Sequence, residues 1–275
     1  MHHTLTSSDG IKLAYYVDNF TDPWKTPETV FLLHSMMGSA QRFYSWMPAL
    51  TAKYQVVRMD MRGHGNSEIP SKDKELTMER LVQDALEVLD ELGIQKPHIL
   101  ANSAGGYVAQ HMAMNHPDRV KSLVLVGSTP GLAKSPTITW IPRIRNEGFE
   151  QFLRVTIADR FHPDYSDPEM VEWFLQDVVK RNDPEFICRW LEFASPLEWG
   201  EELDKVKCPT LIVRPGSETV GAASVYDIML EKIPDVEMVT YAGMPHNIAD
   251  FRAESCVNDA MSFLARRFPQ ARSAA

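Results

Sequence analysis

Short apolar runs alternate with segments of helical length along most of this chain of 275 residues, and that alternation limits the folds it can adopt. Neighbouring parallel strands need a long crossover connection, which is usually a helix. The alternation therefore predicts an α/β fold with a mostly parallel central sheet flanked by helices. The runs that we interpret as strands are 29–33, 55–59, 97–101, 120–126, 208–214 and 236–241.

A hairpin and a set of amphipathic segments complete this pattern. The Asp9-Gly10 dipeptide separates two strand-like runs, and such a dipeptide is typical of a tight turn between antiparallel strands. Apolar residues recur at helical spacing in segment 77–92, which Gly93 follows as a typical helix-ending residue. The segments that we interpret as helices are 40–54, 77–92, 104–115, 224–232 and 249–268.

The alternation stops between residues 131 and 200. This stretch contains no strand-like run, and it is rich in aromatic residues, several of them at helical spacing. An insertion of this kind starts at the carboxyl end of a strand, and the ligand crevice of an α/β sheet lies at that edge. The sequence thus predicts an α/β core formed by residues 1–130 and 201–275, and a helical lid (cap) formed by residues 131–200.

Charge and composition exclude several classes of protein. The net charge of −9 argues against nucleic acid as a ligand, because binding to phosphates needs a basic surface. Every apolar run is shorter than the ~18 residues of a membrane-spanning helix, so we expect no membrane partner and a cytoplasmic protein. The three cysteines are far apart and suggest neither a zinc site nor a disulfide framework. The oligomeric state stays open, with a homodimer among the choices.

Ser103 stands between a predicted strand and a predicted helix, with small residues at Ala101 and Gly105. This pattern is close to the G-x-S-x-G turn in which a strained serine is exposed at a helix N-terminus. Small neighbours are needed because bulky side chains would collide in so tight a turn. Backbone N–H groups at a helix N-terminus can stabilise an oxyanion. The alternative interpretation is a serine that only caps the helix.

Motifs in a fixed order extend this interpretation to nearly the whole chain. They are Leu-Leu-His-Ser-Met-Met-Gly at 32–38, Asp-Met-Arg-Gly-His-Gly-Asn-Ser at 60–67, the Ser103 turn, His-Pro-Asp-Arg-Val at 116–120, Pro-Thr-Leu-Ile-Val at 209–213 and Met-Pro-His-Asn at 244–247. Together they resemble the α/β-hydrolase superfamily of serine hydrolases, including its helical lid.

The resemblance implies a catalytic triad in the order serine, acid, histidine. Ser103 would be the nucleophile, and His246, which follows the last predicted strand, the general base. His34 is the rival histidine, but the family uses the histidine at that place for architecture. The oxyanion donors would be the backbone N–H groups of Met36 and Ala104. The resemblance implies no cofactor, and no metal motif is present.

The resemblance places the triad acid in the loop after the 208–214 strand. Glu218 is the sole carboxylate between Lys205 and Tyr226, which makes it the candidate. The family more often has an aspartate in this loop, so Asp227 and Asp250 remain substitutes.

These expectations lead to a serine hydrolase of small carboxylic esters or lactones that forms an acyl-enzyme. The alternative is a C–C bond hydrolase of ring-cleavage diketones, which Asn102 before the serine favours. A ligand-sensing protein on a hydrolase scaffold is the non-enzymatic alternative. Haloalkane dehalogenases and epoxide hydrolases carry aspartate where this chain has Ser103.

Arginines of the predicted lid are candidates to bind a substrate carboxylate, although solvent exposure is the preferred interpretation for Arg143, Arg145, Arg154 and Arg189.

Overall fold

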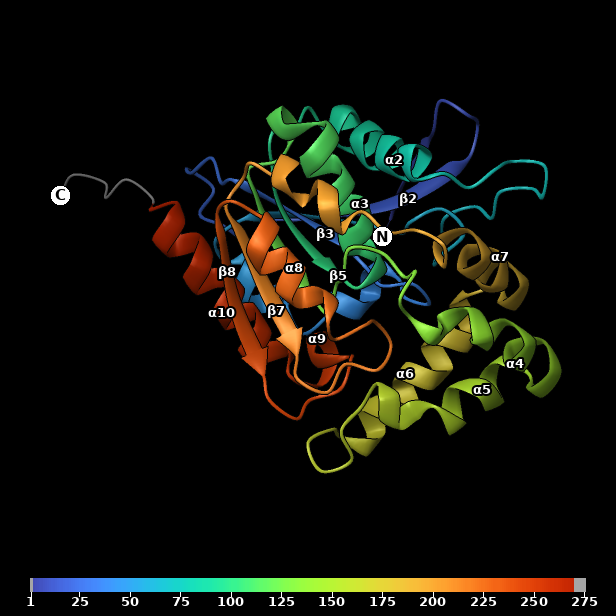
Figure 1. Cartoon of the computed structure of the whole chain (residues 1–275). Coiled ribbons are helices and arrows are strands. Elements are labelled where there is room, and N and C mark those ends of the chain that lie inside the picture. Colours follow the sequence, from blue (N-terminus) through green and yellow to red (C-terminus); the bar gives the residue numbers. More distant parts are fainter. Residues whose placement is uncertain (1, 270–275) are drawn as a thin grey trace.

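A sheet of eight strands organises the structure, a computed structural model that describes residues 2–269 (Figure 1). Its order is β1-β2-β4-β3-β5-β6-β7-β8. The predicted hairpin is present as the antiparallel pair β1–β2, and β2 is also antiparallel to β4, whereas all other pairs are parallel. The strands are β1 His3–Thr6, β2 Lys12–Asp18, β3 Thr29–Leu33, β4 Gln55–Met59, β5 His98–Asn102, β6 Ser122–Val126, β7 Thr210–Pro215 and β8 Val236–Tyr241. The mostly parallel sheet predicted from the sequence is confirmed.

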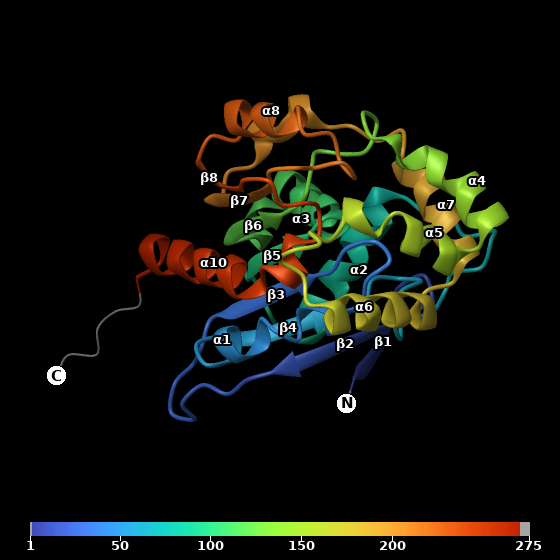
Figure 2. The ribbon, with the colours of Figure 1, turned by 90° about the horizontal axis from the view of Figure 1, so that it is seen from below.

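Helices cover both faces of this sheet, and Figure 2 shows α2, α3 and α8 on one side with α1 and α10 on the other. Alternate residues of β3 face the two layers: Phe31 and Leu33 pack on the side of α2 and α3, whereas Val30 and Leu32 pack on the side of α1 and α10. The helices are α1 Met47–Thr51, α2 Met78–Glu91, α3 Ala104–Asn115, α8 Val225–Lys232, α9 Ile248–Phe251 and α10 Ala253–Arg267. Because both faces are buried, the inner strands β3, β5 and β6 are mostly apolar.

Two predicted helices are divided in the structure. The segment 40–54 forms a 3-10 turn, η1 Ala40–Phe43, and then α1, which begins with Pro48 in its first turn. Proline suits that place because its missing N–H would have no partner there. The last helix, predicted over 249–268, is interrupted at Arg252, whose φ of −118° separates α9 from α10.

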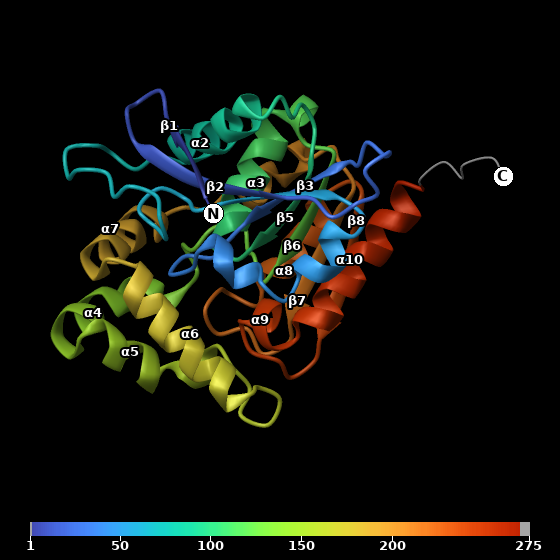
Figure 3. The same ribbon diagram turned by 180° about the vertical axis from the view of Figure 1, so that it is seen from behind.

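Residues 136–199, between β6 and β7, form helices and connecting loops and contain no strand. Figures 1 and 3 show them as a group beside the sheet. Asp167 and Asp183 start two of these helices, because each side chain accepts a backbone N–H of the first turn and a proline follows. The elements are η3 Pro136–Thr139, α4 Trp140–Glu147, α5 Phe149–Val155, η4 Ile157–Asp159, α6 Pro168–Arg181 and α7 Pro184–Ala194, and η5 Gly200–Lys205 follows them.

The insertion has a core of its own, in which Phe152, Leu153 and Ile187 are fully buried. Met37, from the loop after β3, belongs to the same cluster and joins the insertion to the sheet. The division into 1–130, 131–200 and 201–275 stays a prediction, and residues 270–275 of its last segment lie outside the described part of the chain. No helix within residues 2–269 has the length and apolarity needed to cross a bilayer.

The order of the strands reverses at β3, which has β4 on one side and β5 on the other. Ligands of open α/β sheets bind where the strand order reverses, outside the carboxyl ends of the strands. The topology therefore predicts a ligand site at the loops after β3 and β5. Those loops begin at His34 and Ser103.

The loop at 60–67 supports the loop after β3 through buried hydrogen bonds. The Asp60 carboxylate accepts the backbone N–H groups of Ala40 (2.6 Å) and Asn66 (2.9 Å). A Cβ atom at Gly65, where φ is +58°, would lie 2.4 Å from the Asp60 carboxyl carbon. Glycine at this position thus lets the loop fold back on the carboxylate.

His34 is wholly buried and has a structural environment. Its Nε2 accepts the backbone N–H of Met61 (2.9 Å), so its Nδ1 carries the proton and donates to the Ser35 carbonyl (2.8 Å). Burial lowers the pKa of His34 to about 4. Burial and the neighbouring His34 lower the pKa of His64, whose ring centroid lies 5.3 Å away, to about 3. Both imidazoles are therefore neutral in the folded protein at pH 7.

We expect the free energy of unfolding to decrease as the pH falls from 6.5 towards 4. The folded-state pKa of His34 lies below the ordinary value of 6.5, so the unfolded chain binds the proton more readily. The contribution of neutral His34 to the free energy of unfolding is complete above pH 6.5 and is lost as the pH falls through this window. Each unit by which the pKa differs between the folded and unfolded states corresponds to about 1.4 kcal/mol. Urea denaturation at pH 7.5 and pH 4.5 measures the difference. His34→Gln should flatten this dependence and the exposed control His116→Gln should not; equal slopes in all three proteins would contradict the assignment.

Candidate active site

Ser103 occupies a strained turn between β5 and α3. Its φ of 49° and ψ of −117° lie in a region that residues other than glycine rarely adopt, and such strain gathers at functional sites. A Cβ at Gly105 would lie 2.3 Å from the carbonyl oxygen of Leu33, and one at Gly106 would lie 2.1 Å from Ser128 Oγ. Glycine is thus needed at both places for α3 to begin this close to β3 and to the loop after β6.

His246 lies in the loop after β8 and joins Ser103 to an acid. Its Nε2 is 3.0 Å from Ser103 Oγ, and its Nδ1 is 2.8 Å and 3.0 Å from the two carboxylate oxygens of Glu218. All three side chains are nearly or fully buried. The structure therefore brings the three residues named from the sequence into one hydrogen-bonded chain, although 143 positions separate Ser103 from His246.

Glu218 lies in the turn after β7 with its side chain fully buried. Its Oε1 also accepts the backbone N–H groups of Val220 (2.8 Å) and Gly221 (2.9 Å). Burial alone would raise the pKa of this carboxyl, but the charge of His246 and the hydrogen bonds from His246, Gly221 and Val220 hold the pKa below its usual value. The geometry and the charge balance keep Glu218 ionised beside the imidazole.

The two substitute carboxylates lie elsewhere. Asp250 forms a bidentate ion pair with Arg42, with N–O distances of 2.9 Å and 2.5 Å. Asp227 is exposed, with 79% of its side chain accessible, 3.8 Å from Arg214. Neither forms a hydrogen bond with His246 within the part of the chain that the structure describes.

In the described part of the chain, two backbone N–H groups near Ser103 have no hydrogen-bond partner. Within residues 2–269 the N–H groups of Met36 and Ala104 donate no hydrogen bond. Ala104 is the first residue of α3, where an N–H has no partner inside the helix. Met36 lies in the loop after β3, next to Met37, whose φ is +61°. Both groups are free to donate to an oxygen atom of a ligand.

The cavity beside Ser103 and His246 is small. Its volume is about 30 Å³, and Trp140 and Phe174 of the insertion line it together with Met36. A cavity with a volume of ~30 Å³ has room for only a few water molecules. Side chains or the insertion must therefore move before a substrate can enter.

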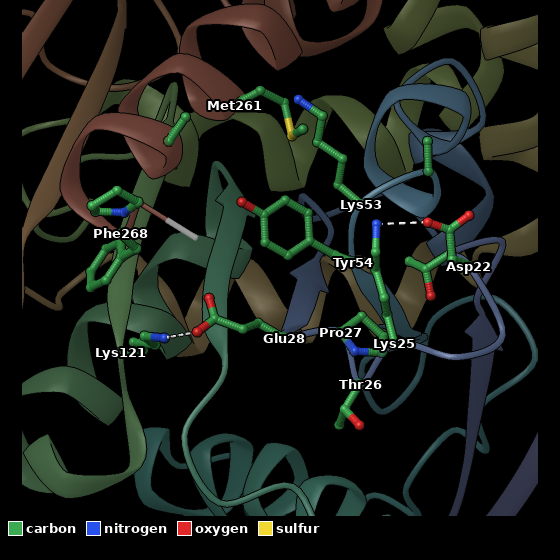
Figure 4. Close-up of a pocket in the computed structure, with 14 residues that line it drawn as sticks. Asp22, Lys25, Thr26, Pro27, Glu28, Lys53, Tyr54, Lys121, Met261 and Phe268 are labelled. Atoms are coloured by element: carbon green, nitrogen blue, oxygen red, sulfur yellow. Dashed lines mark hydrogen bonds and ion pairs between the residues drawn. The ribbon is translucent and has the colours of Figure 1, made fainter. Parts of the chain in front are cut away.

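A much larger cavity, of about 880 Å³, lies away from these residues (Figure 4). It is lined by Glu28, Tyr54, Lys121 and Phe268, among others. Glu28 precedes β3 and Lys121 precedes β6, so this cavity borders the amino ends of the strands. Ser103, Glu218 and His246 lie at the carboxyl ends.

The arginines proposed from the sequence do not line the cavity at Ser103. Three are exposed and paired with glutamates: Arg143 with Glu147, Arg145 with Glu185 and Glu192, and Arg154 with Glu150 and Glu172. Arg189 donates to backbone carbonyls of residues 70, 71 and 74.

Arg42 and Arg160 line the cavity instead, and sequence reasoning missed both. Neither has a motif of its own: one lies in the turn before α1 and the other directly follows η4. Their place at the cavity results from how the loop after β3 and the insertion pack.

Comparisons with known proteins agree with the topology. A family model described as alpha/beta hydrolase fold matches residues 28–253. A Caulobacter sp. (strain K31) protein provisionally named as a carbamate hydrolase is 23% identical over 222 residues, which cover 78% of this chain and 82% of that protein. A Bacillus subtilis (strain 168) protein, provisionally named 2-succinyl-6-hydroxy-2,4-cyclohexadiene-1-carboxylate synthase, is 32% identical over 128 residues, or 46% of this chain and 45% of the relative. The matched part of this chain thus spans less than half the length of that relative.

Among solved structures, the enol-lactonase from Burkholderia xenovorans LB400 has the same fold. Its TM-score is 0.86 with 21% sequence identity, and the alignment covers 96% of this chain and 100% of that chain. With the sheet order, the strained turn at Ser103 and the match over residues 28–253, these findings establish that the chain belongs to the alpha/beta hydrolase fold family.

Proposed function

We propose that this protein is a serine hydrolase of small carboxylic esters or lactones. The observation that carries the proposal is the hydrogen-bonded chain from Ser103 Oγ through His246 to the Glu218 carboxylate. A serine, a histidine and a buried acid in this order are the parts of a nucleophilic triad. No step of the proposed reaction uses a cofactor.

In the first half-reaction, His246 Nε2 takes the proton of Ser103 Oγ while the oxygen attacks the carbonyl carbon of the substrate. The tetrahedral intermediate collapses when the imidazolium gives this proton to the leaving alkoxide, which departs as an alcohol. A water molecule then attacks the acyl-enzyme, His246 accepts the water proton and returns it to Ser103, and the acid product is released. A lactone follows the same path and yields a hydroxy acid.

Glu218 would hold His246 in the reactive tautomer. Its carboxylate accepts Nδ1–H, which leaves Nε2 free to take the serine proton, and its negative charge stabilises the imidazolium. The unpaired N–H groups of Met36 and Ala104 would donate to the oxyanion of the tetrahedral intermediate. These donors are fixed by the backbone, so they need little rearrangement during the reaction.

The insertion would act as a lid. Trp140 and Phe174 reach from it to the cavity beside Ser103, whose volume is too small for an ester substrate. Lids that open for substrate entry and then close over the bound substrate shield the reaction from bulk water. The aromatic lining suits an apolar or ring-bearing part of the substrate.

C–C bond hydrolysis of ring-cleavage diketones is the second candidate. Asn102 precedes Ser103, and its buried side-chain oxygen has no hydrogen-bond partner within residues 2–269. A panel of alkyl esters, lactones and ring-cleavage diketones, assayed with one enzyme preparation, separates the two reactions. Ester or lactone turnover supports the first proposal, diketone cleavage alone the second, and no turnover the ligand-sensing alternative.

Ser103→Ala should abolish turnover and leave the fold intact, since alanine is small enough for the turn. Circular dichroism and ester assays measure the two properties. In the wild-type protein, a serine-directed phosphonate should label Ser103 alone, which peptide mass spectrometry detects. Labelling of another serine, or an active Ser103→Ala variant, would refute Ser103 as the nucleophile.

Glu218→Gln should lower kcat by on the order of 10²–10⁴, because it removes the charge that stabilises the imidazolium and favours the reactive tautomer. The exposed Asp227→Asn is the matched control and should keep wild-type kcat, since Asp227 lies outside the hydrogen-bonded chain. Steady-state kinetics on one ester measures both variants. A Glu218→Gln enzyme with wild-type kcat would exclude Glu218 as the triad acid.

A further inference from the structure

We propose that the natural ester or lactone carries a carboxylate group, and that the guanidinium of Arg160 binds this carboxylate in the cavity beside Ser103. The inference rests on the proposed hydrolase function and adds the chemical class of its substrate. It follows from the burial, the missing partner and the position of this one side chain.

Arg160 is a buried cation that forms no ion pair in the described part of the chain. The residue is only 5% exposed, and within residues 2–269 no carboxylate oxygen lies within 4 Å of its guanidinium nitrogens. Its Nη1 donates to the carbonyl oxygen (3.0 Å) and Oγ1 (2.7 Å) of Thr156, whereas Nε and Nη2 donate to no protein atom in that range. Burial lowers its pKa to about 10 although the charge of Asp159, more than 4 Å away, acts in the opposite direction, so Arg160 remains charged at neutral pH. An uncompensated buried charge is costly, and a bound anion would offset that cost.

The backbone fixes Arg160 beside the reactive histidine. Its carbonyl oxygen accepts the N–H of Asn247 (2.9 Å), and the carbonyl oxygen of Asp159 accepts the N–H of His246 (3.2 Å). The guanidinium lies over the Trp140 ring, 4.9 Å from its centroid. Arg160 lines the same cavity as Ser103 and His246, so a ligand in that cavity meets both the nucleophile and the cation.

Arg42 shows what a satisfied arginine looks like in the same cavity. It is also 5% exposed, but it forms two hydrogen bonds to the Asp250 carboxylate and lies 4.2 Å from the centroid of the Phe174 ring. Within residues 2–269, one of the two buried guanidinium groups thus forms a direct ion pair and the other does not. A carboxylate is the matching ligand, because its single charge balances Arg160 and its two oxygens suit the guanidinium geometry.

The charge of the whole protein strengthens the test of this inference. With a net charge of −9, the surface field disfavours the approach of anions. If the protein nevertheless hydrolyses an anionic ester faster than a neutral one, the preference must come from a cationic group near the reacting atoms.

The test uses pairs of ethyl esters of equal chain length. One member of each pair is the ethyl half ester of succinate, glutarate or adipate, which has a free carboxylate. The other is the neutral ethyl ester of the corresponding straight-chain monocarboxylic acid. For at least one length, the wild-type protein should show a kcat/KM on the order of 10- to 100-fold higher for the anionic ester, in the range of a charge-assisted hydrogen bond. Acid release in a pH-stat measures all substrates alike.

Arg160→Met should reduce this anionic-to-neutral ratio to near one, mainly by raising KM for the anionic ester, and Arg160→Lys should restore part of it. Arg143→Met is the matched control: Arg143 also lies over the Phe152 ring, but it is exposed and paired with Glu147. It should keep the wild-type ratio. An equal loss of the ratio in Arg143→Met would assign the effect to the overall charge of the insertion and overturn the role of Arg160.

The wild-type protein decides the substrate class even if Arg160→Met does not fold. Equal kcat/KM values within every pair would overturn the carboxylate proposal and leave the hydrolase proposal standing. An absence of ester and lactone turnover, together with no phosphonate labelling of Ser103, would overturn the proposed function itself.

Discussion

The close approach of the first turn of α3 to the end of β3 is the contact on which the candidate site depends. A Cβ at Gly105 would meet the carbonyl oxygens of Leu33 and His34 at 2.3 Å and 2.7 Å. Both neighbours are backbone atoms, which cannot rotate away as a side chain could. Glycine at this one position therefore lets Ser103 and the Met36 loop face the same cavity. The strained backbone at Ser103 is maintained because β5, which precedes it, is held between the apolar strands β3 and β6.

The loop with His246 connects this rigid centre to the insertion. His246 contacts Ser103 with one ring nitrogen and Glu218 with the other, and its backbone N–H donates to Asp159 of the insertion. A large movement of the insertion must break that hydrogen bond and the adjacent one from Asn247 to Arg160, or else move the loop as well. Opening of the cavity is thus coupled to the position of the proposed base.

Local sequence patterns predicted the elements that local interactions determine. The strands 29–33, 55–59 and 236–241 and the helix 104–115 have the predicted bounds. In the inner strand 29–33 the continuous apolar run matches continuous burial. The helices predicted over 40–54 and 249–268 were too long. The apolar periodicity continues across the positions where the helical conformation is interrupted, and only the φ and ψ angles show that interruption. Arg160 was missed for a different reason: its significance lies in the absence of a partner, and a sequence does not show which charges are paired.

The sequence by itself determined the alternation that requires a parallel sheet, the small residues around Ser103 and the single carboxylate between Lys205 and Tyr226. Tertiary structure decided the rest. It brought His246 to Ser103 across 143 positions and paired Asp250 with Arg42 instead of His246. It also buried Arg160 with no carboxylate within 4 Å among residues 2–269. The physical reason is that periodicity and steric limits act between chain neighbours, whereas the pairing of buried charges depends on which distant segments share a low-dielectric cavity.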